Sequence, residues 1–241
     1  MQIFWENNFI IPSISDFMNP IQVKREYYDY NFLYSYIAIL LSEMKILVGC
    51  LELYMFLMGK IPSTLIDKQP DIEEIFRVDW LLNFNYTSTF QRYYFNGYHL
   101  KDNDEDVDYI HGKAGLKNII IGVQDTLDKQ HQDVILDCVN FKKYFQRVFF
   151  KTGIKYRQWL PNEKQENNDV FVYIFGHSLD ETDGEVFRYI ICNPNVKMTI
   201  IYYHNDESYQ AKILNLIAII GKDELIRRTG TGNIVFLHQM E

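Results

Sequence analysis

The sequence predicts a mixed α/β protein with a mainly parallel sheet and a helical N-terminal region packed on it. From about residue 77, short apolar runs rich in β-branched and aromatic residues alternate with helical stretches. This alternation is typical of parallel strands joined by helices. Before that point the chain reads as helical. We therefore expect a helical region over residues 1–76 and an α/β core over residues 77–241, as one continuous domain.

The clearest helical signal is "IAILLSEMKILVGCLELYMFLMG", residues 37–59. Apolar residues recur there at intervals of three and four, which predicts a long, largely buried helix in a helical layer. A membrane helix is the alternative, and it is disfavoured because Glu43, Lys45 and Glu52 would be costly inside a bilayer. The predicted packing seam consists of Ile37, Leu41, Met44, Val48, Leu51, Met55 and Met58.

Strands and helices follow in order along the rest of the chain. The expected strands are "VDWLLNF", "YIHG", "NIIIG", "VFVYIFG", "VKMTIIYYH" and "NIVFLH". The expected helices are "TSTFQRYYF", "DGEVFRYII" and residues 133–151 and 207–228, with Ile135, Val139, Tyr144 and Val148 on or near one face of the 133–151 helix. "TGTG" at 229–232 follows a helix, so it predicts a helix end and turn and not a phosphate loop.

Polar residues follow three of the predicted strands. Asn85 ends the first, His111 stands in "IHG", and "GHSLD" follows the strand "VFVYIFG". Ligands of parallel sheets bind beyond the carboxyl ends of the strands, so we expect these residues to meet at one edge of the sheet. An imidazole can act as a general base, and a glycine such as Gly112 lets a ligand approach the backbone closely.

Each motif also has an alternative interpretation. Asn85 could turn the chain, His111 could be a hydrogen-bonded core histidine, and Asp180 or Asp183 could cap a helix. "GHSLD" also resembles a nucleophile elbow with Ser178 as the nucleophile, although that motif requires glycine where Asp180 stands. His177, Asp180 and Asp183 lack a recognised metal-ligand spacing, so no metal is expected.

Charge and composition restrict the classes of partner. The formal net charge of −8 argues against broad nucleic-acid binding, because an acidic surface repels phosphate backbones. The three cysteines, Cys50, Cys138 and Cys192, are far apart and show no metal or redox spacing. With no secretory signal in "MQIFWENNF", we expect a reduced, cytoplasmic protein that does not associate with a membrane.

The motifs "NFNYTSTF", "YIHG", "NIIIG", "FGHSLDETD" and "TIIYYH" occur in one order over residues 78 to about 238. In this order they resemble the bacteriophage abortive infection AbiH family. The resemblance implies a sirtuin-like, Rossmann-like α/β sheet and a role in phage defence, with a phage component as the trigger. It also implies that NAD or a related nucleotide is the substrate or ligand, cleaved at its glycosidic bond.

By this resemblance Asn85 would orient the ribose or an attacking water, and His111 would be the acid/base. The turn in "GHSLDETD" would hold the adenosine half of the nucleotide, with Ser178 and Asp180 as contacts. The nucleotide-binding residues that we expect are Tyr86, Thr87, Gly112, Gly176, His177, Ser178 and Asp180.

AbiH-like proteins usually begin with a strand and a Gly-rich "GNGFD" loop, and the start of this sequence holds no such motif. We therefore expect a gap in the sheet and self-association through open strand edges. Three hypotheses follow: an NAD-cleaving effector, a non-catalytic nucleotide-binding or sensor module, and a truncated remnant that needs a partner chain to complete its sheet.

Overall fold

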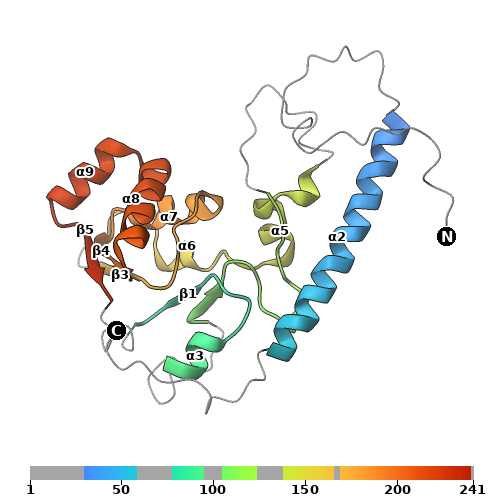
Figure 1. The fold of residues 1–241 in the computed structure, drawn as a ribbon, viewed down its shortest axis with the longest axis horizontal. Coiled ribbons are helices and arrows are strands. Elements are labelled where there is room, and N and C mark those ends of the chain that lie inside the picture. The colour runs from blue at the N-terminus through green and yellow to red at the C-terminus, as the bar shows by residue number, and fades with distance from the viewer. Residues whose placement is uncertain (1–29, 59–77, 95–104, 124–137, 166–168, 240–241) are drawn as a thin grey trace. The chain divides into compact units, whose positions relative to one another are not determined.

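The computed structural model describes residues 30–58, 78–94, 105–123, 138–165 and 169–239 (Figure 1). The chain divides into two compact units, Met1–Leu40 and Leu41–Glu241. The helical structure expected for residues 1–29 and 59–76 lies outside the described residues. The boundary at residues 76 and 77, and the packing of the helical region on the sheet, stay predictions.

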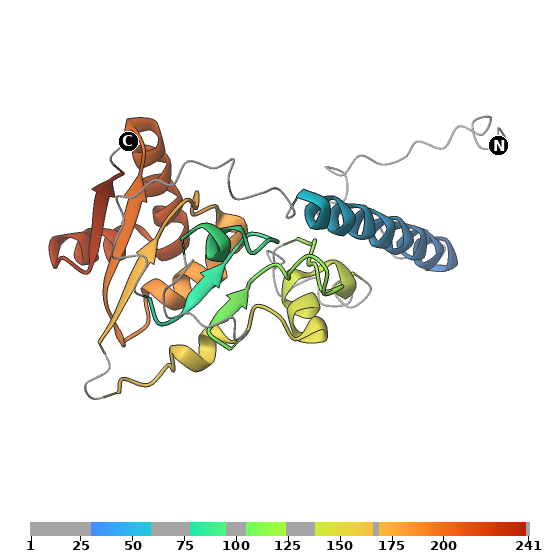
Figure 2. The same ribbon diagram turned by 90° about the horizontal axis from the view of Figure 1, so that it is seen from below.

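The mixed α/β architecture is confirmed, and all described strand pairs are parallel. One sheet has the order β3-β4-β5, and Figure 2 shows its arrows side by side and pointing the same way. The other sheet pairs β1 with β2. The strand bounds are β1 (Leu81–Asn83), β2 (Val107–Tyr109), β3 (Val170–Ile174), β4 (Val196–Tyr203) and β5 (Ile234–His238).

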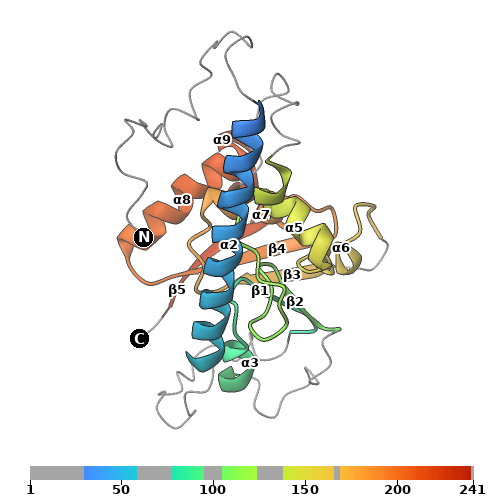
Figure 3. The same cartoon turned by 90° about the vertical axis from the view of Figure 1, so that its right-hand side faces the viewer.

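Three helices accompany the larger sheet: α7 (Gly184–Ile191), α8 (Asp206–Ile220) and α9 (Lys222–Gly230). Helices α7 and α8 pack against β4 (Figure 3). The resulting core is aliphatic and nearly dry, as expected for a parallel sheet covered by helices. Its fully buried members include Leu179, Ile191, Ile201 and Leu216.

The helical stretch expected over residues 207–228 is two helices, separated at Gly221. Helix α8 begins at a capping box, in which the Asn205 side chain accepts from the Ser208 amide and the Ser208 hydroxyl accepts from the Asn205 amide. Two of the four free amides of the helix start are thereby satisfied. The turn expected at "TGTG" is confirmed, because α9 ends at Gly230 and its C-cap is Thr231.

Two expected strands differ. "NIIIG" is not a strand, although Ile119 and Ile120 are buried. Its backbone bonds to other groups: the Ile120 amide donates to the carbonyl of His111, and the Gln146 side chain binds both the amide and the carbonyl of Ile121. "YIHG" is a turn, because β2 has already ended at Tyr109.

The orientation expected for residues 133–151 is wrong where the chain is described. A 3₁₀ turn, η5 (Val139–Phe141), precedes α5 (Lys143–Phe150), and Val148 is 69% exposed. The inward face of α5 instead carries Gln146 and Arg147, which are buried. Polar groups face inward here because Gln146 satisfies the backbone of the neighbouring buried segment.

The long helix is confirmed as α2 (Tyr30–Met58). The predicted seam is its less exposed stripe, but the expectation of a largely buried helix is wrong, since Ile46 is 65% and Leu53 is 60% exposed. The helix is apolar on all sides, and the seam covers only one of them. Among the described helices, none combines the length and apolarity needed to cross a bilayer. Short helices complete the fold: α3 (Thr89–Tyr94), α6 (Tyr156–Trp159) and the 3₁₀ helix η6 (Glu181–Asp183).

The turn at Gly112 gives a test of the fold. Gly112 has φ +83°, and a Cβ there would lie 2.0 Å from the carbonyl oxygen of Asn118. We expect Gly112→Ala to lower the free energy of unfolding by clearly more than the ~1–2 kcal/mol that left-handed strain alone costs. The control is Gly232→Ala, because Gly232 has φ +76° with open space around it. Urea unfolding of both variants makes the comparison, and equal losses would contradict the close approach.

Candidate functional site

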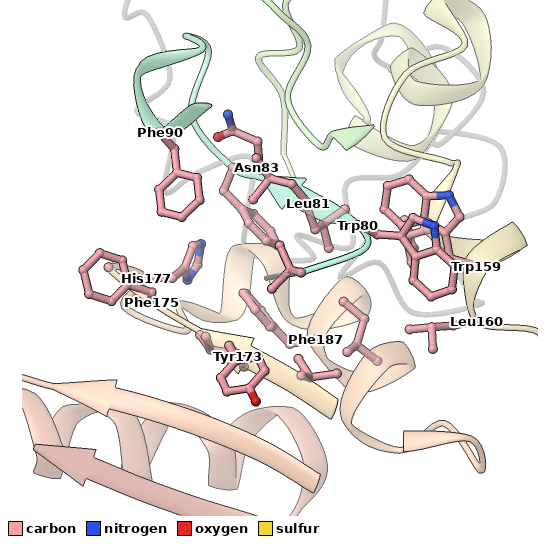
Figure 4. A pocket seen from close by; sticks show the side chains of 18 of the residues that line it. Trp80, Leu81, Asn83, Phe90, Trp159, Leu160, Tyr173, Phe175, His177 and Phe187 are labelled. Atoms are coloured by element: carbon pink, nitrogen blue, oxygen red, sulfur yellow. The ribbon is translucent and has the colours of Figure 1, made fainter. Parts of the chain in front are cut away.

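A pocket of about 910 Å³ separates β1 from β3 (Figure 4). One wall is formed by the chain around β1 and the other by β3 and the turn that follows it. Figure 4 shows stacked Trp80 and Trp159 at one end and Phe90, Phe175 and His177 at the other. The pocket therefore runs along both strands and opens at their carboxyl ends toward polar side chains.

A buried histidine–carboxylate pair lies at that end. His111 follows β2, and Asp183 ends η6, 72 residues later in the chain. His111 Nε2 and Asp183 Oδ2 are 3.1 Å apart, and both side chains line the pocket. Because the carboxylate is ionised, it accepts, and His111 donates through Nε2. The lone pair of a neutral His111 is therefore on Nδ1.

His177 lies beside this pair in a different hydrogen-bonded state. Its Nδ1 accepts the backbone amide of Leu179 at 2.8 Å, and its Nε2 is 3.8 Å from Asp183 Oδ2. A neutral His177 consequently keeps its proton on Nε2, facing Asp183. Helix α8 holds the turn from below, because Lys212 donates to the carbonyl of His177 and Asn215 donates to that of Ser178.

Two cations of α5 complete the cluster. Lys143 Nζ lies 3.1 Å and Arg147 Nη2 3.8 Å from Asp183 Oδ1. Burial alone would raise the pKa of Asp183, but hydrogen bonds from His111 and His177 and the charges of His111 and Lys143 hold it well below the usual range. With neutral histidines, two cations face one carboxylate, so the cluster keeps a net charge of +1 and favours an anionic ligand.

Asn85 lines the pocket and is exposed, so its amide is accessible to a ligand. The neighbouring Asn83 is buried and holds the turn: its Oδ1 accepts the amide of Asn85 at 2.8 Å, and its Nδ2 donates to the carbonyl of Thr87 at 3.1 Å. The polar residue at the end of "LLNFN" that fixes the chain is thus Asn83. This leaves the side chain of Asn85 available for function.

Three of the expected nucleotide-binding residues lie outside the pocket wall: Tyr86, Thr87 and Gly112. The Tyr86 hydroxyl donates to the carbonyl of Ile120, and Thr87 Oγ1 is hydrogen-bonded to Thr89 Oγ1. Burial and the nearby Asp183 raise the pKa of Tyr86. These residues shape the loops around His111.

The turn after β3 contributes Gly176, His177 and Ser178 to the pocket wall. Asp180 is outside the pocket wall and is the N-cap of η6, where its carboxylate accepts the amide of Thr182 at 2.9 Å. This confirms capping by Asp180. Asn85, His111 and the Gly176–Ser178 turn therefore share one pocket, which the sequence predicted from their positions after strands.

Sequence reasoning missed the role of Asp183 as the centre of the cluster, and it missed Lys143 and Arg147 entirely. Asp183 looked like an ordinary helix cap before a glycine, and the α5 cations lay on a face expected to be exposed. A buried carboxylate needs counter-charges, but the sequence cannot show which residues supply them. Within the described residues, no group of three or more His, Cys, Asp or Glu side chains is placed to hold a metal ion.

Removal of the central carboxylate should have a strong, pH-dependent effect on stability. We expect Asp183→Asn to cost about 3–5 kcal/mol near neutral pH, because it leaves buried cations unpaired. The folded-state pKa of Asp183 is depressed, so its contribution is complete above pH ~5 and is lost as the pH falls below ~4, where the unfolded carboxylate protonates. The stability difference between wild type and variant should therefore shrink on acidification.

Denaturant titrations from pH 7 to pH 3 measure this difference. Asp180→Asn is the matched control, since Asp180 is exposed and asparagine caps a helix equally well. Its effect should be small at every pH. A pH-independent difference for Asp183→Asn would contradict the ionised, paired carboxylate.

Comparison with known proteins gives one match. The family model described as bacteriophage abortive infection AbiH matches residues 5–204. No curated protein and no solved structure shows significant similarity to the chain. The matched region contains both walls of the pocket and the residues of the His111–Asp183 cluster. Because the match covers most of the sequence, the chain belongs to the AbiH family of bacteriophage abortive infection proteins.

Proposed function

We propose that this protein acts in phage defence by abortive infection and that its pocket binds NAD or a related nucleotide and hydrolyses the glycosidic bond. Family membership supports the defence role. The observation that carries the reaction is the buried His111–Asp183 pair in the wall of a nucleotide-sized pocket. Sirtuin-like, Rossmann-like topology is part of the same proposal, and the parallel strands support it.

His111 is the general base in this proposal. Asp183 holds its Nε2–H, which fixes the ring and leaves the Nδ1 lone pair for a proton. His177 is the weaker candidate, because its Nδ1 already accepts the Leu179 amide. The pair therefore offers a base and a neighbouring histidine that binds or positions.

The reaction replaces the bond between the anomeric carbon and the nicotinamide nitrogen with a bond to water oxygen. The bonding electrons leave with nicotinamide, whose ring thereby becomes neutral, and Nδ1 of His111 takes the water proton. The products are nicotinamide and ADP-ribose. The exposed amide of Asn85 would orient the ribose or the water, which is a positioning contribution.

Binding would use the aromatic side chains and the net positive charge at the carboxyl end of the pocket. Phe84, Phe90 and Phe175 line that end and provide ring faces for a base. The excess charge of Lys143 and Arg147 over Asp183 attracts the pyrophosphate. The Gly176–Ser178 turn would contact the adenosine half of the nucleotide.

The nucleophile-elbow alternative has less support. Ser178 is exposed, and within the described residues no histidine is hydrogen-bonded to its hydroxyl. The bond that fixes this residue is to its carbonyl, from Asn215. An activated serine requires a base at its hydroxyl.

Incubation of the purified chain with NAD, followed by measurement of nicotinamide release, tests the reaction. We expect His111→Ala to lower turnover by about a hundredfold or more, because a positioned base is lost. Asn85→Ala should also lower turnover, and Ser178→Ala should be the mildest of the three. His177→Ala is the matched control on the second histidine, and it should retain more activity than His111→Ala.

Circular dichroism and nucleotide binding by calorimetry establish that each variant is folded and still binds. Full activity in His111→Ala would end the catalytic assignment, and Ser178→Ala as the most damaging change would favour a serine nucleophile. Binding of NAD by wild type without product release would support a non-catalytic sensor module instead.

A further inference from the structure

The two sheets face each other with open strand edges across the pocket. Among the described strands, β1 pairs with β2 alone and β3 pairs with β4 alone. The other edges of β1 and β3 form opposite walls of the pocket. An open edge presents a row of unpaired backbone donors and acceptors, and here two such rows face the same space.

The hydrogen-bond pattern identifies the groups that face this space. In β1 the Leu81 amide and the Asn83 carbonyl bond toward β2. Parallel strands alternate their bonding direction residue by residue, so the N–H and C=O of Leu82 face the pocket. In β4 the Thr199 amide bonds toward β5, so Ile200 bonds toward β3, and its register partner Tyr173 also turns its backbone groups to the pocket.

The two edges run in the same direction. At the carboxyl ends, Phe84 contacts His177 with ring centroids 4.5 Å apart. At the amino ends, Trp80 stacks on Trp159, and the next two residues, Leu160 and Pro161, are hydrogen-bonded to the Asn193–Asn195 loop that also binds Val170. A segment that bonded to both edges would therefore be a parallel strand between two parallel strands.

Side chains define the chemistry of that segment. Leu82 and Val172 line the space, and both pack on the same core cluster, which includes Val186 and Ile190 of α7. A strand there would be covered by apolar groups, which favours β-branched residues. Asp79 and Asp169 line the amino end of the pocket, which favours a basic residue just before the strand.

We propose that the space between β1 and β3 is a docking slot for one extended apolar segment of a partner polypeptide, preceded by a basic residue and added as a parallel strand. The segment would join the two sheets into one. This inference does not depend on NAD cleavage, because the slot lies along the strands, whereas His111 and Asp183 lie beyond their carboxyl ends.

A defined peptide tests the proposal with the wild-type chain. The probe is fluorescein-labelled Lys-Val-Ile-Val-Ile-Gly, and the matched control is Lys-Val-Pro-Val-Pro-Gly, which lacks two backbone donors. We expect saturable binding of the probe by fluorescence anisotropy and at least tenfold weaker binding of the proline peptide. Hydrogen exchange at Leu82 and Tyr173 should slow when the probe is bound, while exchange in the centre of β4 stays unchanged.

A charge exchange tests the direction of entry. Asp79→Lys should weaken probe binding about two- to fivefold, as exposed charge pairs do, and should strengthen binding of Glu-Val-Ile-Val-Ile-Gly. Asp223→Lys makes the same change at an exposed position of α9 and should leave both affinities unaltered.

Three results would overturn the proposal. The first is absence of probe binding, and the second is equal affinity for the proline peptide. The third is protection of the Leu82 and Tyr173 amides in the chain without peptide, which would mean that the slot is already closed. If that protection rose with protein concentration in step with sedimentation of a dimer, the occupant would be a second copy of the chain.

Discussion

The buried carboxylate of Asp183 is the interaction on which the candidate site depends. It connects four residues from three separate parts of the chain: His111 after β2, Lys143 and Arg147 on α5, and His177 after β3. Few other polar contacts join the small sheet to the large one. The same ion pair therefore orients the proposed base and holds the two halves of the pocket wall together.

Much of the larger sheet could be predicted from the sequence, because its elements obey local rules. The apolar runs "VFVYIFG", "VKMTIIYYH" and "NIVFLH" are strands β3, β4 and β5, and "DGEVFRYII" is α7. The less regular middle of the chain could not be predicted this way. "NIIIG" has the composition of a strand, but the side chain of Gln146, distant in sequence, satisfies the backbone that a neighbouring strand would otherwise bind.

The candidate site shows the same division between local and long-range information. The positions of Asn85, His111 and the Gly176–Ser178 turn follow from the general rule that loops after parallel strands meet, and all of them line one pocket. Burial of Asp183 and of the polar face of α5 depends on pairing between distant segments. Periodicity predicts burial of apolar residues, so a helix that turns Arg147 inward is assigned the wrong face.

The stacked indoles of Trp80 and Trp159 have a practical consequence. Their ring planes are within 5° of parallel, with centroids 5.8 Å apart, and they come from chain segments on either side of the pocket's amino end. Two aromatic chromophores at that separation couple their electronic transitions, which gives a circular dichroism couplet sensitive to their mutual angle. The protein thus carries an intrinsic optical gauge, with which any opening or closing of the space between its sheets can be followed without a label.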